Sequence, residues 1–133
     1  MRYLLDTNIL CKQDTYAKAR TWILQHYLQI GISSVTVAEI AGGIEALPPS
    51  KRRTELEGFL SELVQDYTVY PFGLDEAYAW ARYVNQVNRP VPRYDSLIAA
   101  TALANNLEVV TENVTDFPGL KVINPLKARP SLP

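Results

Sequence analysis

The sequence predicts an α/β fold of three layers, in which a central, mostly parallel sheet of about five strands is flanked by helices. Short and nearly all-apolar runs, which are typical of strands buried on both faces, alternate along the chain with longer segments of helical periodicity. The chain has 133 residues, of which 47% are hydrophobic and 20% charged. This length suffices for one domain with a single core, and we expect residues 1–133 to form it.

In the first half of the chain, helices are recognised by apolar residues that recur at every third or fourth position. Ala19, Ile23 and Tyr27 are such a series. Proline ends helices, so Pro48 and Pro49 separate one predicted helix from the next. The elements expected here are a strand over about residues 2–5, a helix over 16–28, a strand over 31–35, and helices over 36–47 and 51–65.

In the second half, the same patterns predict a strand and two helices and then two short strands. The last helix is expected to stop near Asn105 and Asn106, because asparagine tolerates the left-handed conformation found at helix ends. The elements expected here are a strand over residues 68–72, helices over 74–87 and 94–106, and strands over 108–111 and 121–124.

Composition excludes several classes of function. A net charge of −1 argues against a strongly basic nucleic-acid binder. The only cysteine is Cys11 and the only histidine is His26, so one chain forms neither a disulfide framework nor a Cys-based or two-histidine zinc site. No glycine-rich phosphate loop is present. The apolar runs are too short to span a membrane, and we expect a cytoplasmic protein.

Four acidic residues stand near the predicted strand ends, and each has an ordinary structural explanation. Asp6 and Asp95 can cap the helices that follow them. Glu39 follows Thr36 at the spacing of a capping box, and Asp116 lies in a turn-like segment. Considered one at a time, each of these acids can be explained by local structure without a functional role.

Taken together, the four acids point to a shared site. Asp6 and Asp116 follow predicted strands, and Glu39 lies in the helix after another, so all three face the carboxyl edge of the sheet. Asp95 joins them if its helix starts at the same edge. Four converging carboxylates repel each other and raise one another's pKa values unless a cation compensates. Mg²⁺ and similar hard cations prefer carboxylate oxygens, so the pattern favours a Mg²⁺ or Mn²⁺ site, whose usual chemistry is phosphoryl transfer.

Four segments resemble the PIN-domain family, and specifically the VapC-type toxin ribonucleases of toxin–antitoxin pairs. They are "LLDTNIL", "SSVTVAEI", "YDSLIAATAL" and "VVTENVTDFPGLKVINP". The resemblance spans nearly the whole chain and implies a Mg²⁺- or Mn²⁺-dependent endoribonuclease that acts on tRNA or other structured RNA. It also implies a cognate VapB-like antitoxin and a homodimer. Tyr78, Trp80 and Tyr83 are candidate anchors for the dimer, and the alternative is that they belong to the core.

The resemblance implies roles residue by residue. Asp6, Asp95 and Asp116 would hold the metal, and Glu39 would orient or deprotonate the attacking water, which leaves a 5′-phosphate. One departure concerns Glu112, which stands where many relatives carry arginine. The other expected contributors are Thr7, Asn8, Thr111 and Asn113 as positioning residues and Arg82, Arg89 and Arg93 as RNA backbone contacts.

Two other functions remain open from the sequence. One is a catalytically inactive PIN-like domain that binds RNA or a protein partner. The other is a phosphatase of the haloacid-dehalogenase type, which needs a second aspartate two residues after the first. Asn8 occupies that position here.

Overall fold

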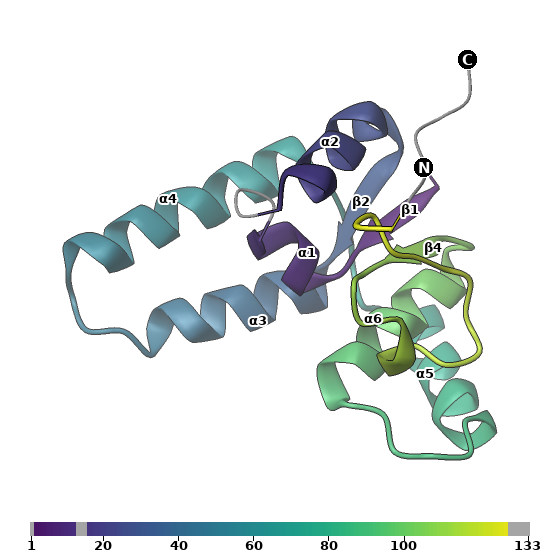
Figure 1. Ribbon diagram of the computed structural model, residues 1–133. Helices are drawn as coiled ribbons and strands as arrows, with labels where there is room; N and C mark the ends of the chain where they lie inside the picture. The colour runs from purple at the N-terminus through teal and green to yellow at the C-terminus, as the bar shows by residue number, and fades with distance from the viewer. Residues whose placement is uncertain (1, 13–15, 128–133) are drawn as a thin grey trace.

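The computed structural model describes residues 2–12 and 16–127, and at its centre lies a five-stranded sheet (Figure 1). Every strand pair is parallel, and the strand order is β3-β2-β1-β4-β5. All five strands predicted from the sequence are present, with ends that differ by at most two residues. They are β1 (Tyr3–Leu5), β2 (Ile30–Ser33), β3 (Thr68–Tyr70), β4 (Glu108–Val110) and β5 (Val122–Ile123).

The helices confirm the predicted order. The helix expected over residues 16–28 is shorter, because it ends at Gln25 and the 3₁₀ helix η1 follows it, and the 3₁₀ helix η2 is an added element. Asn106 adopts a φ of 56° just after α6, as expected for a left-handed residue at a helix end. The short helix α1 begins at Thr7, as the capping explanation of Asp6 expects. In chain order the helices are α1 (Thr7–Lys12), α2 (Ala17–Gln25), η1 (Tyr27–Gln29), α3 (Ser34–Glu45), α4 (Lys51–Asp66), α5 (Leu74–Gln86), α6 (Arg93–Ala104) and η2 (Val114–Asp116).

Two apolar clusters, one for each face of the sheet, confirm the three layers. Side chains alternate between the faces of a strand. Leu5 packs with residues of α1, α2 and α4, whereas its neighbour Leu4 packs with residues of α5 and α6. Leu4 and Leu5 are both fully buried. The strands therefore read as continuous apolar runs because both faces are covered.

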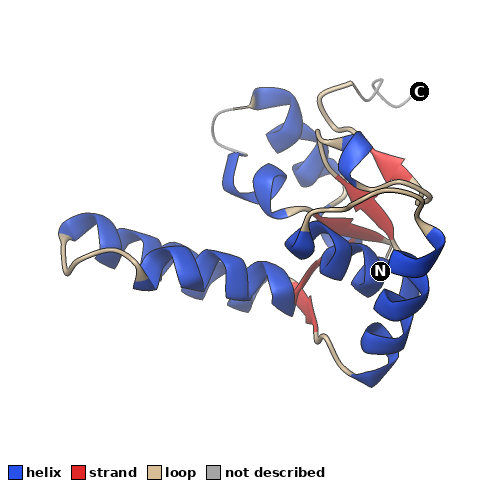
Figure 2. Cartoon of the chain, turned by 90° about the horizontal axis from the view of Figure 1, so that it is seen from below, coloured by secondary structure: helices blue, strands red, loops and turns tan. Residues whose placement is uncertain are grey.

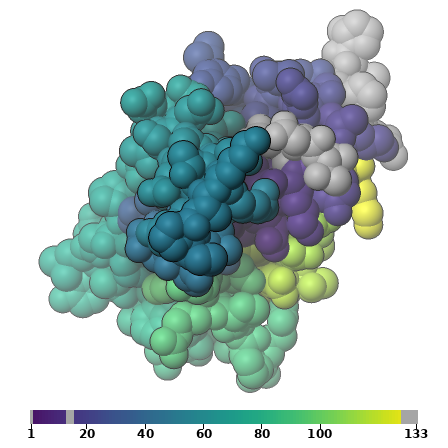
Figure 3. Space-filling view, turned by 90° about the vertical axis from the view of Figure 1, so that its left-hand side faces the viewer, coloured from purple at the N-terminus to yellow at the C-terminus, as the bar shows by residue number. Residues whose placement is uncertain are grey.

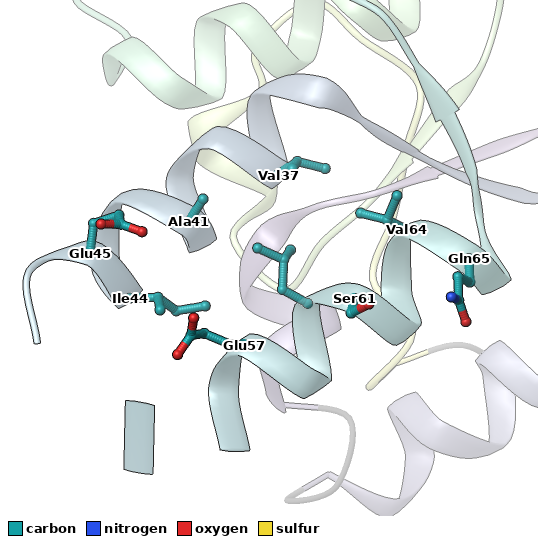
Figure 4. A pocket seen from close by; sticks show the side chains of 9 residues that line it. Val37, Ala41, Ile44, Glu45, Glu57, Ser61, Val64 and Gln65 are labelled. Carbon is teal, nitrogen blue, oxygen red and sulfur yellow. The ribbon is translucent and has the colours of Figure 1, made fainter. Parts of the chain in front are cut away.

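Helices α3 and α4 form a hairpin that projects beyond the sheet (Figures 1 and 2). The Ser50 hydroxyl caps α4 by accepting from the Arg53 amide at 3.1 Å, and Arg53 Nη1 donates to the Leu47 carbonyl at 2.9 Å across the turn. Between the two helices lies a groove of about 490 Å³, which Figure 4 shows from close by. Its walls include Val37 and Ile44 of α3 and Val64 of α4.

The strand order places the reversal of the chain between β1 and β4. From β1 the chain moves outward through β2 to β3, and it later returns to the other side of β1 as β4 and β5. Leu5 pairs with Val110 at the carboxyl ends of these two strands, and the Asp6 amide donates to the Val110 carbonyl at 2.9 Å. In open α/β sheets a reversal of this kind leaves a crevice where ligands bind.

No helix in residues 2–12 and 16–127 has the length and apolar character needed to cross a membrane.

Candidate active site

Asp6 lies at the strand reversal and is held from several directions. Thr111, which follows β4, donates its hydroxyl to Asp6 Oδ2 at 2.8 Å. Both side chains are buried, with 2% of Asp6 and none of Thr111 exposed. Burial raises the pKa of Asp6, the Thr111 hydroxyl and the Thr7 and Asn8 amides lower it, and the Glu39 charge raises it. The two amides at the start of α1 give Asp6 the helix-capping contacts expected from the sequence, and the buried carboxylate also faces a second acid.

Glu39 reaches the site from α3 and is tied to α1. The Thr7 hydroxyl donates to Glu39 Oε1 at 2.8 Å and lies 3.2 Å from the hydroxyl of Thr36. The capping-box explanation of Glu39 is wrong, because α3 begins at Ser34 and the Ser33 hydroxyl caps it by accepting from the Val35 amide. Thr36 is therefore a buried helical residue, and Glu39 lies in the second turn.

Asp95 comes from the first turn of α6, where it is the third helical residue. Its explanation as an N-cap is wrong, since Pro92 takes that position. Burial, and then the charges of Asp6, Asp116 and Glu39 in that order of size, together raise the pKa of Asp95 to about 7. The other three predicted acids therefore lie near enough to Asp95 to act on its charge.

Asp116 is the last residue of η2, in the segment that follows β4. Its amide donates to the Asn113 carbonyl at 3.0 Å, so the turn expected here is present. The Asn113 amide in turn donates to the Thr111 hydroxyl at 3.0 Å. A chain of hydrogen bonds thus connects Asp116 through Asn113 and Thr111 to Asp6.

The chemistry of these donors suits a hard divalent cation. Four acidic side chains converge here, and the charges of the other three add to burial in raising the pKa of Asp95 to about 7. Oxygen ligands of this kind match the preference of Mg²⁺ and Mn²⁺. In the described part of the chain, no group of three or more histidine, cysteine or acidic side chains is arranged to hold a metal ion as it stands. The donor types fit the ion, and the ligand set itself is a proposal.

The three predicted RNA-contact arginines lie in different places. Arg93 begins α6, two residues before Asp95. Arg89 donates to the backbone carbonyl of Thr115, beside Asp116. Arg82 lines a hollow with Leu103 and Ala104 at the opposite end of α6. Since a helix rises 1.5 Å per residue, Arg82 lies on the order of 12 Å along α6 from Asp95.

An ion pair beside the four acids, between Lys12 and Glu112, could not be predicted from the sequence patterns. Lys12 Nζ, at the end of α1, lies 3.3 Å from Glu112 Oε1. The two residues are 100 positions apart, so only the pairing of β1 with β4 brings them together. Glu112, the departure noted in the sequence, thus has a lysine as its partner.

A groove leads from the acidic site between α1 and the α3–α4 hairpin. It measures about 770 Å³, and Thr7, Cys11 and Glu39 line its end at the site. Figure 3 looks onto the tip of the hairpin and shows the purple surface of α1 next to it. The rest of the groove is lined mostly by apolar residues of α3, α4 and the turn between them, together with Arg52 and Glu55 of α4. The apolar residues are Ile40, Gly43, Ile44, Leu47, Leu56 and Phe59.

Comparisons with known proteins agree with this geometry. The family model described as PIN domain matches residues 3–118. "Ribonuclease VapC1" of Rickettsia felis is 30% identical over 129 residues, which are 92% of this chain and 96% of that protein. The "tRNA(fMet)-specific endonuclease VapC" of Salmonella typhimurium is also 30% identical, with the same coverage.

Solved structures share the fold. FitAcB from Neisseria gonorrhoeae superposes with a TM-score of 0.82 at 24% identity, over 95% of this chain and 99% of that one. A toxin–antitoxin complex from Klebsiella pneumoniae contains a chain that superposes with a TM-score of 0.74 at 24% identity, over 92% of this chain and 97% of that one. The chain therefore belongs to the PIN domain family, as a relative of the VapC ribonucleases.

Proposed function

We propose that this protein is a Mg²⁺- or Mn²⁺-dependent endoribonuclease toxin that hydrolyses phosphodiester bonds in tRNA or other structured RNA. The observation that carries the proposal is the set of four mutually repelling carboxylates at the strand reversal, where the pKa of Asp95 is raised to about 7. The names of the VapC relatives support the reaction, and that of the Salmonella protein supports tRNA as the substrate class.

Each acid has a proposed role that follows from its surroundings. Asp6, Asp95 and Asp116 would hold the ion, which when bound neutralises phosphate charge and acidifies a water molecule. Glu39 has one oxygen engaged by the Thr7 hydroxyl, so its other oxygen is the one we assign to orienting the water or taking its proton. Thr111 fixes the rotamer of Asp6, because it donates to one carboxylate oxygen and is itself fully buried.

The remaining sequence candidates are assigned by position. Thr7 positions Glu39, and the Asn8 and Asn113 side chains are proposed to contact substrate or ligands. Arg93, which is exposed two residues before Asp95, is the candidate for an RNA phosphate. Hydrolysis by water rather than by the 2′-hydroxyl would leave a 5′-phosphate on the product.

We place a cognate VapB-like antitoxin in the groove between α1 and the α3–α4 hairpin. The groove is mostly apolar and opens at Thr7 and Glu39, so a bound segment would cover the entrance to the acidic site. Amphipathic segments commonly bind such grooves through a few apolar anchors. The toxin–antitoxin complex among the structural neighbours supports a partner of this kind.

The test is Asp6→Asn, compared with wild type and with Asp66→Asn, an exposed acid at the end of α4. Asparagine caps helices about as well as aspartate, so the fold should persist. We expect cleavage of bulk tRNA to fall by at least about 100-fold, since even residues that only support a metal ligand cost 10–100-fold. The Asp66 variant should cleave like wild type, and the products should carry 5′-phosphates.

Thermal unfolding separates loss of the site from loss of the fold. Mn²⁺ at 100 times its Kd should stabilise the wild type by about 2.7 kcal/mol, because it binds only the folded state. Asp6→Asn should lose most of this gain while its metal-free melting temperature stays equal or rises, since one repelling charge is gone. Wild-type protein that binds RNA without metal-dependent cleavage would instead establish the inactive, RNA-binding alternative.

A further inference from the structure

Asp116 lies in a shorter secondary-structure element than the other acids, and this element alone does not hold its backbone in place. Asp6 directly follows a central strand and Asp95 lies within a 12-residue helix, whereas Asp116 ends a 3₁₀ helix of three residues. It stands six positions beyond the end of β4 at Val110. A short 3₁₀ turn has poorer hydrogen-bond geometry than an α-helix, so its position depends on contacts from elsewhere in the fold.

Two side chains from the α5 region hold the backbone on either side of Asp116. Arg89, which follows α5, donates through Nη2 to the Thr115 carbonyl. Tyr83 of α5 donates its hydroxyl to the Pro118 carbonyl at 2.8 Å. Phe117, between these two attachments, is 1% exposed and packs in the apolar cluster of α5 and α6.

We propose that Arg89 is a positioning residue for Asp116, with Tyr83 as the second anchor of the same segment. The bond from the charged Arg89 guanidinium is exposed to solvent, and it restrains the residue next to Asp116. Tyr83 is 4% exposed and packed in the core, so its hydroxyl is a fixed point. Together they tie Asp116 to the helix pair α5–α6, which also carries Asp95.

The alternative role for Arg89, expected from the sequence, is a direct contact with RNA phosphates. The two roles differ in what they change. A phosphate contact acts on RNA binding and leaves metal affinity alone, whereas a positioning residue acts on the metal site before any RNA is present. The inference rests on the proposed function, because it assumes that Asp116 belongs to a metal site.

The experiment compares Arg89→Ala and Arg89→Lys with Arg20→Ala, an exposed arginine on α2, which packs on the other face of the sheet. Mn²⁺ affinity is measured by calorimetry, and kcat and KM are measured on tRNA. We expect Arg89→Ala to weaken Mn²⁺ binding on the order of 10-fold, with kcat reduced and KM little changed. Arg89→Lys should recover part of the affinity, since an ammonium also donates to a carbonyl.

Hydrogen exchange gives a readout that needs neither metal nor RNA. The Asp116 amide donates to the Asn113 carbonyl and should exchange faster in Arg89→Ala. Tyr83→Phe, which keeps the ring in the core and removes only the hydroxyl, should speed exchange in the same segment.

Unchanged exchange and unchanged Mn²⁺ affinity in Arg89→Ala, with or without a raised KM, would overturn the inference. A wild type that binds no Mn²⁺ would refute the proposed function instead, whereas faster exchange would still establish the anchoring of the Asp116 segment.

Discussion

At the scale of single residues, the distinguishing feature of this site is the repulsion between its four acidic side chains. Asp6, Glu39, Asp95 and Asp116 act on each other because β1, α3, α6 and the segment after β4 all meet at one strand reversal. Their repulsion disfavours the folded state when all are ionised, so part of the stability of the protein depends on protons or on a bound cation.

The first prediction at this scale concerns pH and Asp95. Its pKa is raised from 3.8 to about 7 in the folded protein, so between these values the folded state holds a proton that the unfolded chain has lost. Stability then decreases as pH rises through this window. We expect the melting temperature of the protein in EDTA to fall between pH 5 and pH 8. Asp95→Asn should flatten this dependence, and an equal slope in both proteins would show that Asp95 does not cause it.

The second prediction concerns the Lys12–Glu112 pair. Lys12 pairs with Glu112, the neighbour of Thr111, so Lys12→Ala should leave an extra negative charge beside the site where we propose that RNA binds. We expect KM for tRNA to rise roughly 2- to 5-fold with kcat unchanged, because interactions of a single exposed charge are weak. The rise in KM should be smaller at high salt, which screens exposed charges. The double variant Lys12→Ala with Glu112→Ala should recover most of the loss. A double variant as impaired as the single one would mean that Lys12 contacts RNA itself.

At the scale of elements, sequence patterns predicted the longer helices and all five strands, but not the 3₁₀ helices. Helix α1 has six residues, too few to display a helical period beside a strand, so only the capping explanation of Asp6 pointed to it. Ser33 and Thr36 are both residue types that cap helices well, and Ser33 is the one used because β2 ends there, where it pairs with Tyr70 of β3.

The acidic residues of the site were predictable because parallel strands present their carboxyl ends at one edge. The bonds from Arg89 and Tyr83 were not, because they join segments far apart in sequence.

Gly31 tests how tightly the strands and their side chains pack. A Cβ at this position in β2 would lie 2.5 Å from Tyr70 Cε2 and 3.1 Å from the Thr68 carbonyl oxygen of β3. We expect Gly31→Ala to lower the free energy of unfolding in urea by about 1–3 kcal/mol, as overpacking does. Gly58→Ala on α4, where a Cβ meets nothing within 4 Å, should instead raise it by about 0.5–1 kcal/mol. A Gly31 variant as stable as wild type would show that Tyr70 moves aside freely.

At the scale of the whole molecule, the three aromatic anchors proposed for a homodimer separate into two kinds. Tyr83 is buried, so the core alternative holds for it and it is not an exposed anchor. Trp80 is 36% exposed and donates its indole N–H to the Ser96 hydroxyl at 2.9 Å. Tyr78 is 61% exposed on α5, and Leu74 and Leu103 are exposed on α5 and α6. We call these three residues the α5–α6 patch. Exposed apolar side chains that lie together in this way are typical of an interface.

The α5–α6 patch also carries charges that suit pairing with a second copy of itself. Asp75 and Arg82 line the same hollow beside Tyr78. In a two-fold interface the same patch of both subunits is in contact, so if residue i contacts residue j of the partner, j also contacts i of the partner. An acid and a base on one patch can therefore form two ion pairs across the interface. We therefore expect a dimer by light scattering and its loss in Tyr78→Glu, which places a charge at the centre. Leu28→Glu, at an apolar residue that is 87% exposed far from this patch in η1, should leave the dimer intact. A wild type of monomer mass at every concentration, or a dimer broken by Leu28→Glu alone, would show that the α5–α6 patch is not the dimer interface.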